Sequence, residues 1–268
     1  MGFPQVNCEM ELISDQHIKD PDGGYTIALY PTAAIFPLYI YPDTDCTAWT
    51  TLFDSITANP NLLFYVIINP DSGPSNFDSN YQACVPKLLA LGDNVKIVGY
   101  VLTGDGTRDS SEVLADIATY MAFPTTYRPS GIFFDETSAT SEFLAEYTTY
   151  AEQVRSDVTS DSIVILNPGT NVADTSYFSI ADFIVTAEQF YDDFDWPSSL
   201  VIDSTNPVGQ QIVILHDGPT TLPTSLMQEM VEGGIAATFI TSVAQDSAYE
   251  TIPPYWEEEC AELTSLQE

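Results

Sequence analysis

The sequence predicts an α/β fold, a single-domain (β/α)8 TIM barrel over about residues 34–260 that follows an N-terminal extension, residues 1–33. Short apolar runs rich in Val, Ile, Phe and Tyr alternate eight times with amphipathic segments, as expected of βαβ units. Most runs lack a period of two, which is typical of parallel strands buried on both faces. The alternative is an open doubly wound sheet, but Tyr41-Pro42-Asp43 follows the first run, where a nucleotide-binding sheet usually has a glycine-rich turn. The barrel is therefore the favoured fold.

The eight apolar runs are the predicted strands, and each has the length of an ordinary strand in a globular protein. They are Ile35–Tyr41, Phe64–Asn69, Lys96–Leu102, Gly131–Asp135, Ile163–Asn167, Phe183–Glu188, Gln211–His216 and Ala236–Thr241. Polar residues are nearly absent from the runs until their last positions. The strand ends are therefore where functional side chains are expected.

The segments between the runs predict helices. Apolar residues recur at helical spacing over residues 49–56, 81–89, 113–120, 143–154 and 226–231. Asp109 and Ser141 are predicted N-caps, since their side chains can accept hydrogen bonds from the free amides of a first helical turn. Gly92 and Gly233 are predicted stop signals. The acidic run Glu257-Glu258-Glu259 is interpreted as a solvated surface.

Charge excludes two classes of partner. The chain has 39 Asp and Glu against 6 Lys and Arg, a formal net charge of −33. Six cations cannot form the basic stripe that binds nucleic acid, or hold the chain on an anionic membrane surface. No apolar run approaches the roughly 20 residues that cross a bilayer. A neutral or cationic partner is expected, although strong acidity also serves solubility alone.

No cofactor or metal is predicted. The chain has no Walker sequence, no GxGxxG, no GxSxG and no Cys-x-x-Cys. It has only two histidines, His17 and His216, so a three-histidine zinc site is excluded. His216 followed by Asp217 is interpreted either as an acid–base pair or as a buried histidine with a hydrogen-bond partner.

Four cysteines permit three complete pairings in an oxidising compartment. The termini of a barrel meet, which favours Cys8–Cys260. Cys46 and Cys84 lie near the starts of the first two predicted helices, which makes Cys46–Cys84 compatible with disulfide geometry. The first residues lack the features of a signal peptide, so either a signal has been removed or the protein is intracellular. Few lysines, many Ser and Thr, and an even cysteine count favour secretion.

The candidate site lies at the carboxyl ends of the strands, where barrel enzymes carry their reactive groups. Asp135 and Glu136 end the fourth predicted strand and Glu188 ends the sixth. Two acids facing each other across a sugar are what glycoside hydrolysis requires, one to protonate the leaving oxygen and one to attack or to activate water. The predicted substrate-binding residues at neighbouring strand ends are Tyr39, Asn69, Tyr100, Asn167 and His216. The alternative for the acids at strand ends, Asp135 and Glu188, is a helix cap, and the alternative for Tyr39, Tyr100 and Asn69 is a hydrogen-bonded loop anchor.

Several of these stretches form a recognisable set. They are Pro37-Leu-Tyr-Ile-Tyr-Pro42, Val66-Ile-Ile-Asn-Pro-Asp-Ser-Gly-Pro74, Val98-Gly-Tyr-Val-Leu-Thr103, Gly131-Ile-Phe-Phe-Asp-Glu136 and Val185-Thr-Ala-Glu188. With this set the chain resembles the spherulin-4 family over roughly residues 34–241. The resemblance implies a (β/α)8 fold and an endo-acting glycoside hydrolase that cuts α-1,4-linked N-acetylgalactosamine in galactosaminogalactan, an exopolysaccharide of biofilm matrix. It also implies that Asp135, Glu136 and Glu188 are the essential acids.

Together these expectations describe a secreted, monomeric hydrolase of a neutral or cationic aminosugar polymer. Asp135 is expected to be the nucleophile or an electrostatic stabiliser, and Glu188 the general acid, with a pKa raised by burial and by its neighbour. Glu136 is expected to orient one of them or to hold an acetamido group. Two alternatives stay open at this point. One is a non-catalytic polysaccharide-binding protein of a spore or cell wall, and the other is a glycosidase for a different α-linked hexosaminide or galactoside.

Overall fold

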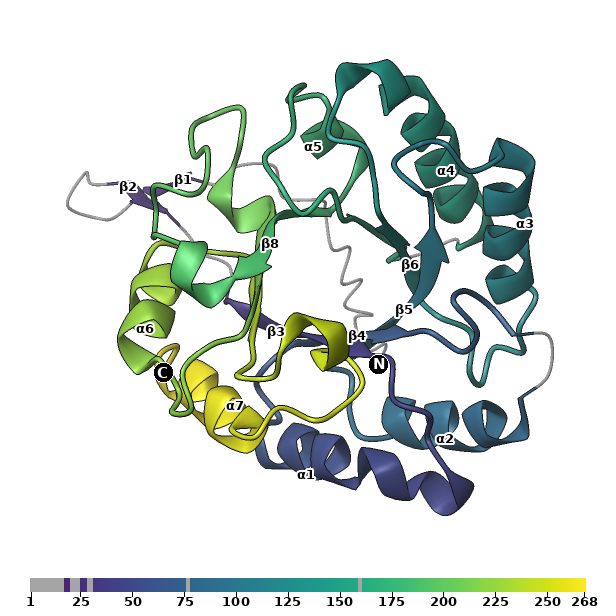
Figure 1. Ribbon diagram of the computed structural model, residues 1–268, viewed down its shortest axis with the longest axis horizontal. Helices are drawn as coiled ribbons and strands as arrows, with labels where there is room; N and C mark the ends of the chain where they lie inside the picture. The colour runs from purple at the N-terminus through teal and green to yellow at the C-terminus, as the bar shows by residue number, and fades with distance from the viewer. Residues whose placement is uncertain (1–16, 20–24, 28–30, 76–77, 159–160) are drawn as a thin grey trace, which may run out of the picture. The chain divides into compact units, whose positions relative to one another are not determined.

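The computed structural model confirms the (β/α)8 barrel (Figure 1). It describes residues 17–19, 25–27, 31–75, 78–158 and 161–268. The chain divides into two compact units, Met1–Tyr30 and Pro31–Glu268. In the first, β1 (His17–Lys19) pairs antiparallel with β2 (Tyr25–Ile27). The second unit is the barrel.

Eight parallel strands close the barrel in the order β10-β3-β4-β5-β6-β7-β8-β9. Their bounds are β3 (Ala33–Leu38), β4 (Phe64–Ile68), β5 (Val95–Leu102), β6 (Gly131–Asp135), β7 (Ile163–Leu166), β8 (Phe183–Phe190), β9 (Gln211–His216) and β10 (Ala237–Ile240). All eight predicted strands are present, and β6 and β9 agree with the sequence at both ends. β3 ends earlier than predicted, and β8 continues two residues past Glu188. Their shared direction brings all eight carboxyl ends to one mouth of the barrel.

Helices surround the strands, as Figure 1 shows. They are α1 (Thr50–Ala58), α2 (Ser79–Leu89), α3 (Ser110–Met121), α4 (Leu144–Asp157), α5 (Tyr177–Ile180), α6 (Thr224–Glu232) and α7 (Trp256–Ser265). The Asp109 cap is confirmed, because its carboxylate accepts a hydrogen bond from the amide of Ser111. The Ser141 cap is wrong: Ser141 begins a short 3-10 turn, η2 (Ser141–Phe143), that leads into α4. Among the described helices, none is long and apolar enough to cross a membrane.

The acidic run at the start of α7 is only partly a solvated surface. Glu257 and Glu258 are exposed, but Glu259 is 0 % exposed and points toward β10, where its carboxylate accepts a hydrogen bond from the amide of Ile240 at 3.1 Å. The prediction was wrong for this residue because successive positions of a helix are about 100° apart, so three in a row are spread over about 200° of its circumference. Glu259 is the one of the three that falls on the face toward the barrel.

Side chains fill the barrel interior and the layer between strands and helices. Tyr65 of β4 and Phe183 of β8 contact each other with ring centroids 5.0 Å apart, although their strands are not neighbours, so they meet inside the barrel. Phe36 of β3 packs outward against Trp256 of α7 at 4.6 Å. Gly131 begins β6 where a Cβ atom would lie 1.8 Å from the carbonyl oxygen of Ile163, so only glycine fits between these strands. Because side chains fill the barrel interior and the layer around the strands, a binding site is expected at the mouth.

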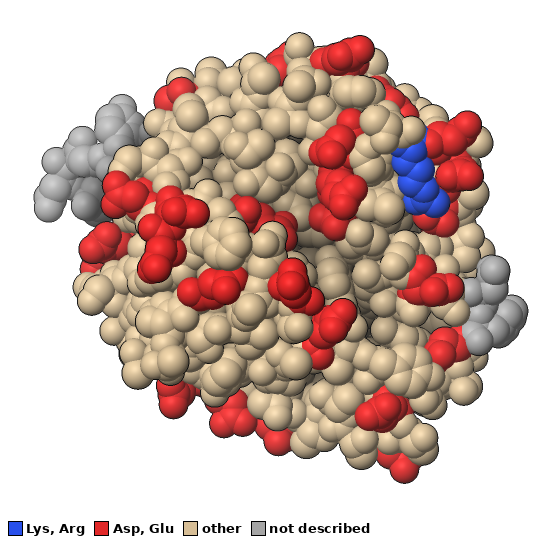
Figure 2. Space-filling view, viewed as in Figure 1, with Lys and Arg blue, Asp and Glu red and all other residues tan. Residues whose placement is uncertain are grey.

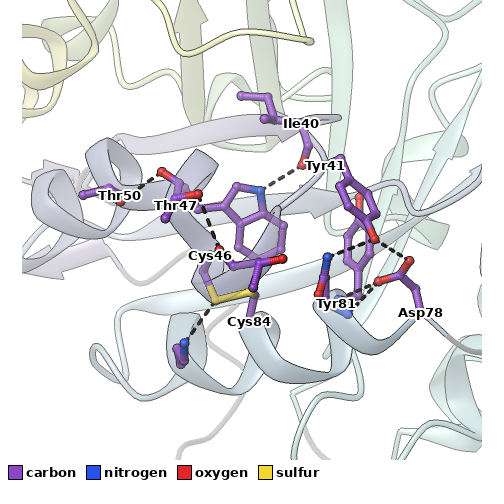
Figure 3. Close-up of a disulfide and its surroundings, with 12 residues drawn as sticks. Ile40, Tyr41, Cys46, Thr47, Thr50, Asp78, Tyr81 and Cys84 are labelled. Atoms are coloured by element: carbon purple, nitrogen blue, oxygen red, sulfur yellow. Dashed lines mark hydrogen bonds between the residues drawn. A yellow bond between two sulfur atoms is a disulfide. The ribbon is translucent and has the colours of Figure 1, made fainter.

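A disulfide ties the first βα loop to the second helix of the barrel. Cys46, in η1 (Thr44–Trp49), is bonded to Cys84 of α2 with a Cα–Cα distance of 5.5 Å, which confirms that predicted pair (Figure 3). At the end of η1, the indole of Trp49 donates to the carbonyl of Ile40 at 2.9 Å. Cys260 is buried and has no disulfide partner among the described residues, and its predicted partner Cys8 lies outside them.

Removing this disulfide is expected to lower the free energy of unfolding by about 4 kcal/mol, because the bond closes a loop with a sequence separation of 38 and so limits the entropy of the unfolded chain. The variant is Cys46→Ala/Cys84→Ala, and the measurement is urea unfolding followed by far-UV circular dichroism. As the control, wild type and variant are both measured in dithiothreitol, where the two should unfold at the same midpoint. A loss below about 1 kcal/mol would contradict the prediction.

Candidate active site

Asp135 and Glu188, two of the predicted acids, meet at the mouth through the side chain of Asn167. The Asn167 amide nitrogen donates one hydrogen bond to Asp135 Oδ1 at 2.7 Å and another to Glu188 Oε2 at 2.6 Å. Because both oxygens contact the same nitrogen, they lie no further apart than the sum of the two distances, 5.3 Å. The ends of β6, β7 and β8 therefore place two carboxylates within reach of one bound sugar.

The orientation of the Asn167 amide is fixed by the turn that follows β7. Asn167 Oδ1 accepts a hydrogen bond from the amide of Gly169 at 3.0 Å, which leaves the nitrogen directed at the two acids. Gly169 has a φ of 63°, a left-handed conformation that favours glycine, and its carbonyl accepts from the amide of Glu188 at 3.1 Å. Asn167, predicted as a contact to substrate, thus holds the acid pair itself.

Three tyrosines complete the surroundings of the pair. The Tyr100 hydroxyl donates to Asp135 Oδ2 at 2.8 Å, and the Tyr249 hydroxyl donates to Glu188 Oε1 at 2.5 Å. Tyr39 contacts both tyrosines edge to face, with ring centroids 5.4 Å from Tyr100 and 5.6 Å from Tyr249. Each of the four carboxylate oxygens therefore accepts a hydrogen bond from a neighbouring side chain.

Asp135 and Glu188, together with Tyr39 and Tyr249, line a cavity of about 110 Å³. Its apolar lining comes from Pro37, Phe133 and Ile214, on three strands. The space-filling view along the barrel shows a hollow at the centre, bordered by acidic side chains (Figure 2). An apolar cavity with a few convergent polar groups is typical of a small-molecule or sugar site.

Burial raises the pKa of both acids. For Asp135 the loss of solvent raises the pKa, whereas the hydrogen bonds from Tyr100 and Asn167 oppose the shift. For Glu188 burial again raises the pKa most, the hydrogen bond from Tyr249 opposes it, and the charge of Asp135 raises it further. Two neighbouring carboxyls with raised pKa values do not readily ionise together. They are therefore suited to acid–base chemistry in which one is ionised while the other keeps its proton.

Glu136 follows Asp135 directly but does not line the cavity with the pair. β6 ends at Asp135, and Glu136 has a φ of 48° that turns its exposed side chain toward the rim. Hydrogen bonds to its carbonyl from the Asp105 amide at 2.6 Å and the Thr103 hydroxyl at 2.7 Å hold this unusual backbone. Reduced solvation raises the pKa of Glu136, and the charges of Asp135 and Asp105 add to the shift. The two adjacent acids thus face different surroundings.

The remaining predicted residues divide between the mouth and the surrounding loops. His216 ends β9, is 1 % exposed and contacts Asp217 through its Nδ1 at 2.9 Å from Oδ2. Asn69 does not join the acids, because its side chain accepts a hydrogen bond from the amide of Gly73 at 2.8 Å and so shapes its own loop. Of the five predicted binding residues, Tyr39, Tyr100 and Asn167 surround the acid pair.

Tyr249 was missed by the sequence prediction. It lies in the loop between β10 and α7, outside every predicted strand and helix, and reaches the site because its carbonyl accepts a hydrogen bond from the amide of Tyr39 at 3.2 Å. An aromatic residue in the last strand-to-helix loop of a predicted barrel is the only signal that the sequence offers. Its contact with Glu188 depends on a loop conformation that periodicity does not encode.

A parallel barrel with two half-buried carboxylates at its mouth is the arrangement that many sugar-cleaving enzymes use. Comparison with known proteins gives the family. The model of spherulation-specific family 4 matches residues 33–263, so the chain belongs to that family, as the sequence motifs predicted.

Two relatives illustrate the match. Spherulin-4 of Physarum polycephalum is 38% identical over 164 residues, which are 59% of this chain and 45% of the relative, so the match spans less than half of that protein. The crystal structure of Aspergillus clavatus Sph3 in complex with GalNAc superposes with a TM-score of 0.78 at 32% identity, and the match covers 87% of this chain and 98% of that one.

Proposed function

We propose that this protein is a secreted glycoside hydrolase that cuts α-1,4-linked N-acetylgalactosamine within galactosaminogalactan. The observation that carries the proposal is the pair Asp135 and Glu188, held by one amide with the two facing oxygens at most 5.3 Å apart. The GalNAc complex of Sph3 supports a sugar of this class as the ligand. The Cys46–Cys84 disulfide supports an oxidising, extracellular location.

The spacing of the acids favours a retaining mechanism, in which the carboxyl groups are about 5–5.5 Å apart rather than the roughly 6.5–9.5 Å that leaves room for an attacking water. Asp135 accepts hydrogen bonds on both oxygens, which stabilise its anion, and attacks the anomeric carbon. Glu188 gives its proton to the leaving oxygen, so the glycosidic bond breaks as the bond to Asp135 forms. Glu188 then takes a proton from water, which attacks the same carbon and releases Asp135.

Glu136 and the surface charge suit an aminosugar polymer. The exposed carboxylate of Glu136 stands at the rim beside Asp135, where it can accept a hydrogen bond from an acetamido N–H or pair with a free amine. A net charge of −33 attracts stretches of polymer that have lost their acetyl groups and are cationic. Both features support the substrate class of the resemblance.

The direct test is incubation with galactosaminogalactan, with released oligosaccharides identified by mass spectrometry. A ladder of N-acetylhexosamine oligomers is expected, together with retention of the anomeric configuration in the first product seen by NMR. Chitin, which carries β-linked N-acetylglucosamine, is the control and should stay intact. Binding of the polymer without release of any fragment would contradict an enzyme and would favour the non-catalytic polysaccharide-binding alternative.

Tyr249→Phe is expected to shift the pH profile of this hydrolysis. The Tyr249 hydroxyl bonds to Glu188 and lowers the pKa of that carboxyl, so its removal raises the pKa and moves the descending alkaline limb of kcat to higher pH. We expect kcat at the optimum to fall about tenfold, which corresponds to about 1.4 kcal/mol. Tyr255→Phe is the matched control, because the Tyr255 hydroxyl has no partner among the described residues. An unmoved alkaline limb would argue against Glu188 as the general acid.

A further inference from the structure

Phe190 is an apolar side chain in an unexpected place. It ends β8, two residues after Glu188, and 44 % of its surface is exposed. Alternate residues of a strand point to the same face, so the Phe190 ring follows Glu188 toward the mouth and lies one layer further out. The pairing of β8 with β9 agrees, because Glu188 is opposite Ile214, which lines the cavity, and Phe190 is opposite His216.

The ring is held from one side by His216. The two ring centroids are 4.7 Å apart at an interplanar angle of 78°, an edge-to-face contact. His216 is itself fixed by Asp217, whose Oδ2 lies 2.9 Å from His216 Nδ1 and also accepts a hydrogen bond from the amide of Gln245 at 2.9 Å. Phe190 thus has a fixed, buried support on one side and open solvent on the other.

We propose that Phe190 is the stacking platform for the sugar on the leaving-group side of the scissile bond. The proposal rests on the proposed function, in which Glu188 protonates the leaving oxygen. The sugar that carries this oxygen has to lie next to Glu188 and outside the cavity, which is where the Phe190 ring is exposed. A pyranose presents a face of C–H groups, and an exposed aromatic ring packs against such a face and removes apolar surface from water.

The test separates substrates that fill this position from one that leaves it empty. Phe190→Ala is expected to lower kcat/KM for galactosaminogalactan oligosaccharides about tenfold or more. Hydrolysis of α-N-acetylgalactosaminyl fluoride should change less than about twofold, because fluoride leaves without a sugar in that position. Phe190→Trp should restore most of the oligosaccharide activity. The control is Val201→Ala: Val201 is 48 % exposed, and its carbonyl contacts Gln211 at the start of β9, the end of the strand opposite the mouth.

If Phe190→Ala lowers kcat/KM equally for the oligosaccharide and the fluoride, Phe190 only supports the local structure and the proposed platform is overturned. If wild type cleaves neither substrate, the proposed function fails, and calorimetric binding of the same oligosaccharides decides about Phe190 separately. An affinity at least about tenfold weaker for Phe190→Ala than for Val201→Ala supports the platform. Equal affinities, or no binding by wild type, overturn it.

Discussion

Glu188→Gln is expected to lower kcat on galactosaminogalactan by at least about a thousandfold, because the amide cannot transfer a proton to the leaving oxygen. Glutamine keeps the shape of the side chain, with its oxygen accepting from Asn167 and its nitrogen donating to the Tyr249 hydroxyl, the two present partners of Glu188. The fold and the affinity for oligosaccharide should therefore survive. The measurements are reducing-end release, thermal unfolding and calorimetric binding.

Asp135→Asn is the companion variant and should lose activity to a similar extent, because the neutral amide is a poor nucleophile and cannot stabilise positive charge at the anomeric carbon. Glu250→Gln is the matched control, an exposed carboxylate next to Tyr249 that undergoes the same chemical change. It should keep near wild-type activity. More than about one per cent residual activity in either acid variant would argue that the pair is not the catalytic pair.

Glu259→Gln is expected to remove a contribution of Glu259 that lowers the free energy of unfolding as pH rises. Glu259 is 0 % exposed, and its Oε2 has no hydrogen-bond partner among the described residues. Burial raises the pKa of this carboxyl well above its ordinary value of 4.5. Above that value the unfolded chain releases the proton while the folded protein keeps it, so stability falls as pH rises, by about 1.4 kcal/mol per pH unit, until the folded pKa is reached. Glutamine carries no such proton.

The measurement is urea unfolding of wild type and Glu259→Gln at pH 4, 5.5 and 7. The variant should gain stability relative to wild type as pH rises, and the other carboxyls cancel in the difference because both proteins carry them. Glu258→Gln is the matched control, one residue away and exposed, and should follow wild type at every pH. A difference between wild type and Glu259→Gln that is independent of pH would mean that folding does not raise the pKa of Glu259.

The sequence predicted what periodicity and chain direction determine. Apolar runs located all eight strands, and parallel direction then placed Asp135, Asn167 and Glu188 at one mouth without any knowledge of distances. The positions of Cys46 and Cys84 near the starts of two predicted helices were likewise compatible with a disulfide that the structure confirms.

What the sequence could not supply depends on loop conformation and on rotation about single bonds. Tyr249 reaches Glu188 from a loop with no periodic pattern, and Asn167 proves to bridge the acids only because Gly169 fixes its amide. Asp135 and Glu136 are adjacent acids that the sequence does not distinguish. The left-handed φ at Glu136 places their side chains in different surroundings. In the same way, the sequence does not distinguish the buried Glu259 from the exposed Glu257 and Glu258 in the acidic run of α7.

The hydrogen bonds around the acid pair also bear on how tightly a single sugar can bind. Each of the four oxygens of Asp135 and Glu188 already accepts one bond from the protein, and a sugar hydroxyl that enters the cavity adds a second bond only in exchange for its bonds with water. Such an exchange contributes little net affinity. Most of the attraction for a polymer then comes from units outside the cavity, and a long chain is held far more firmly than a single monosaccharide.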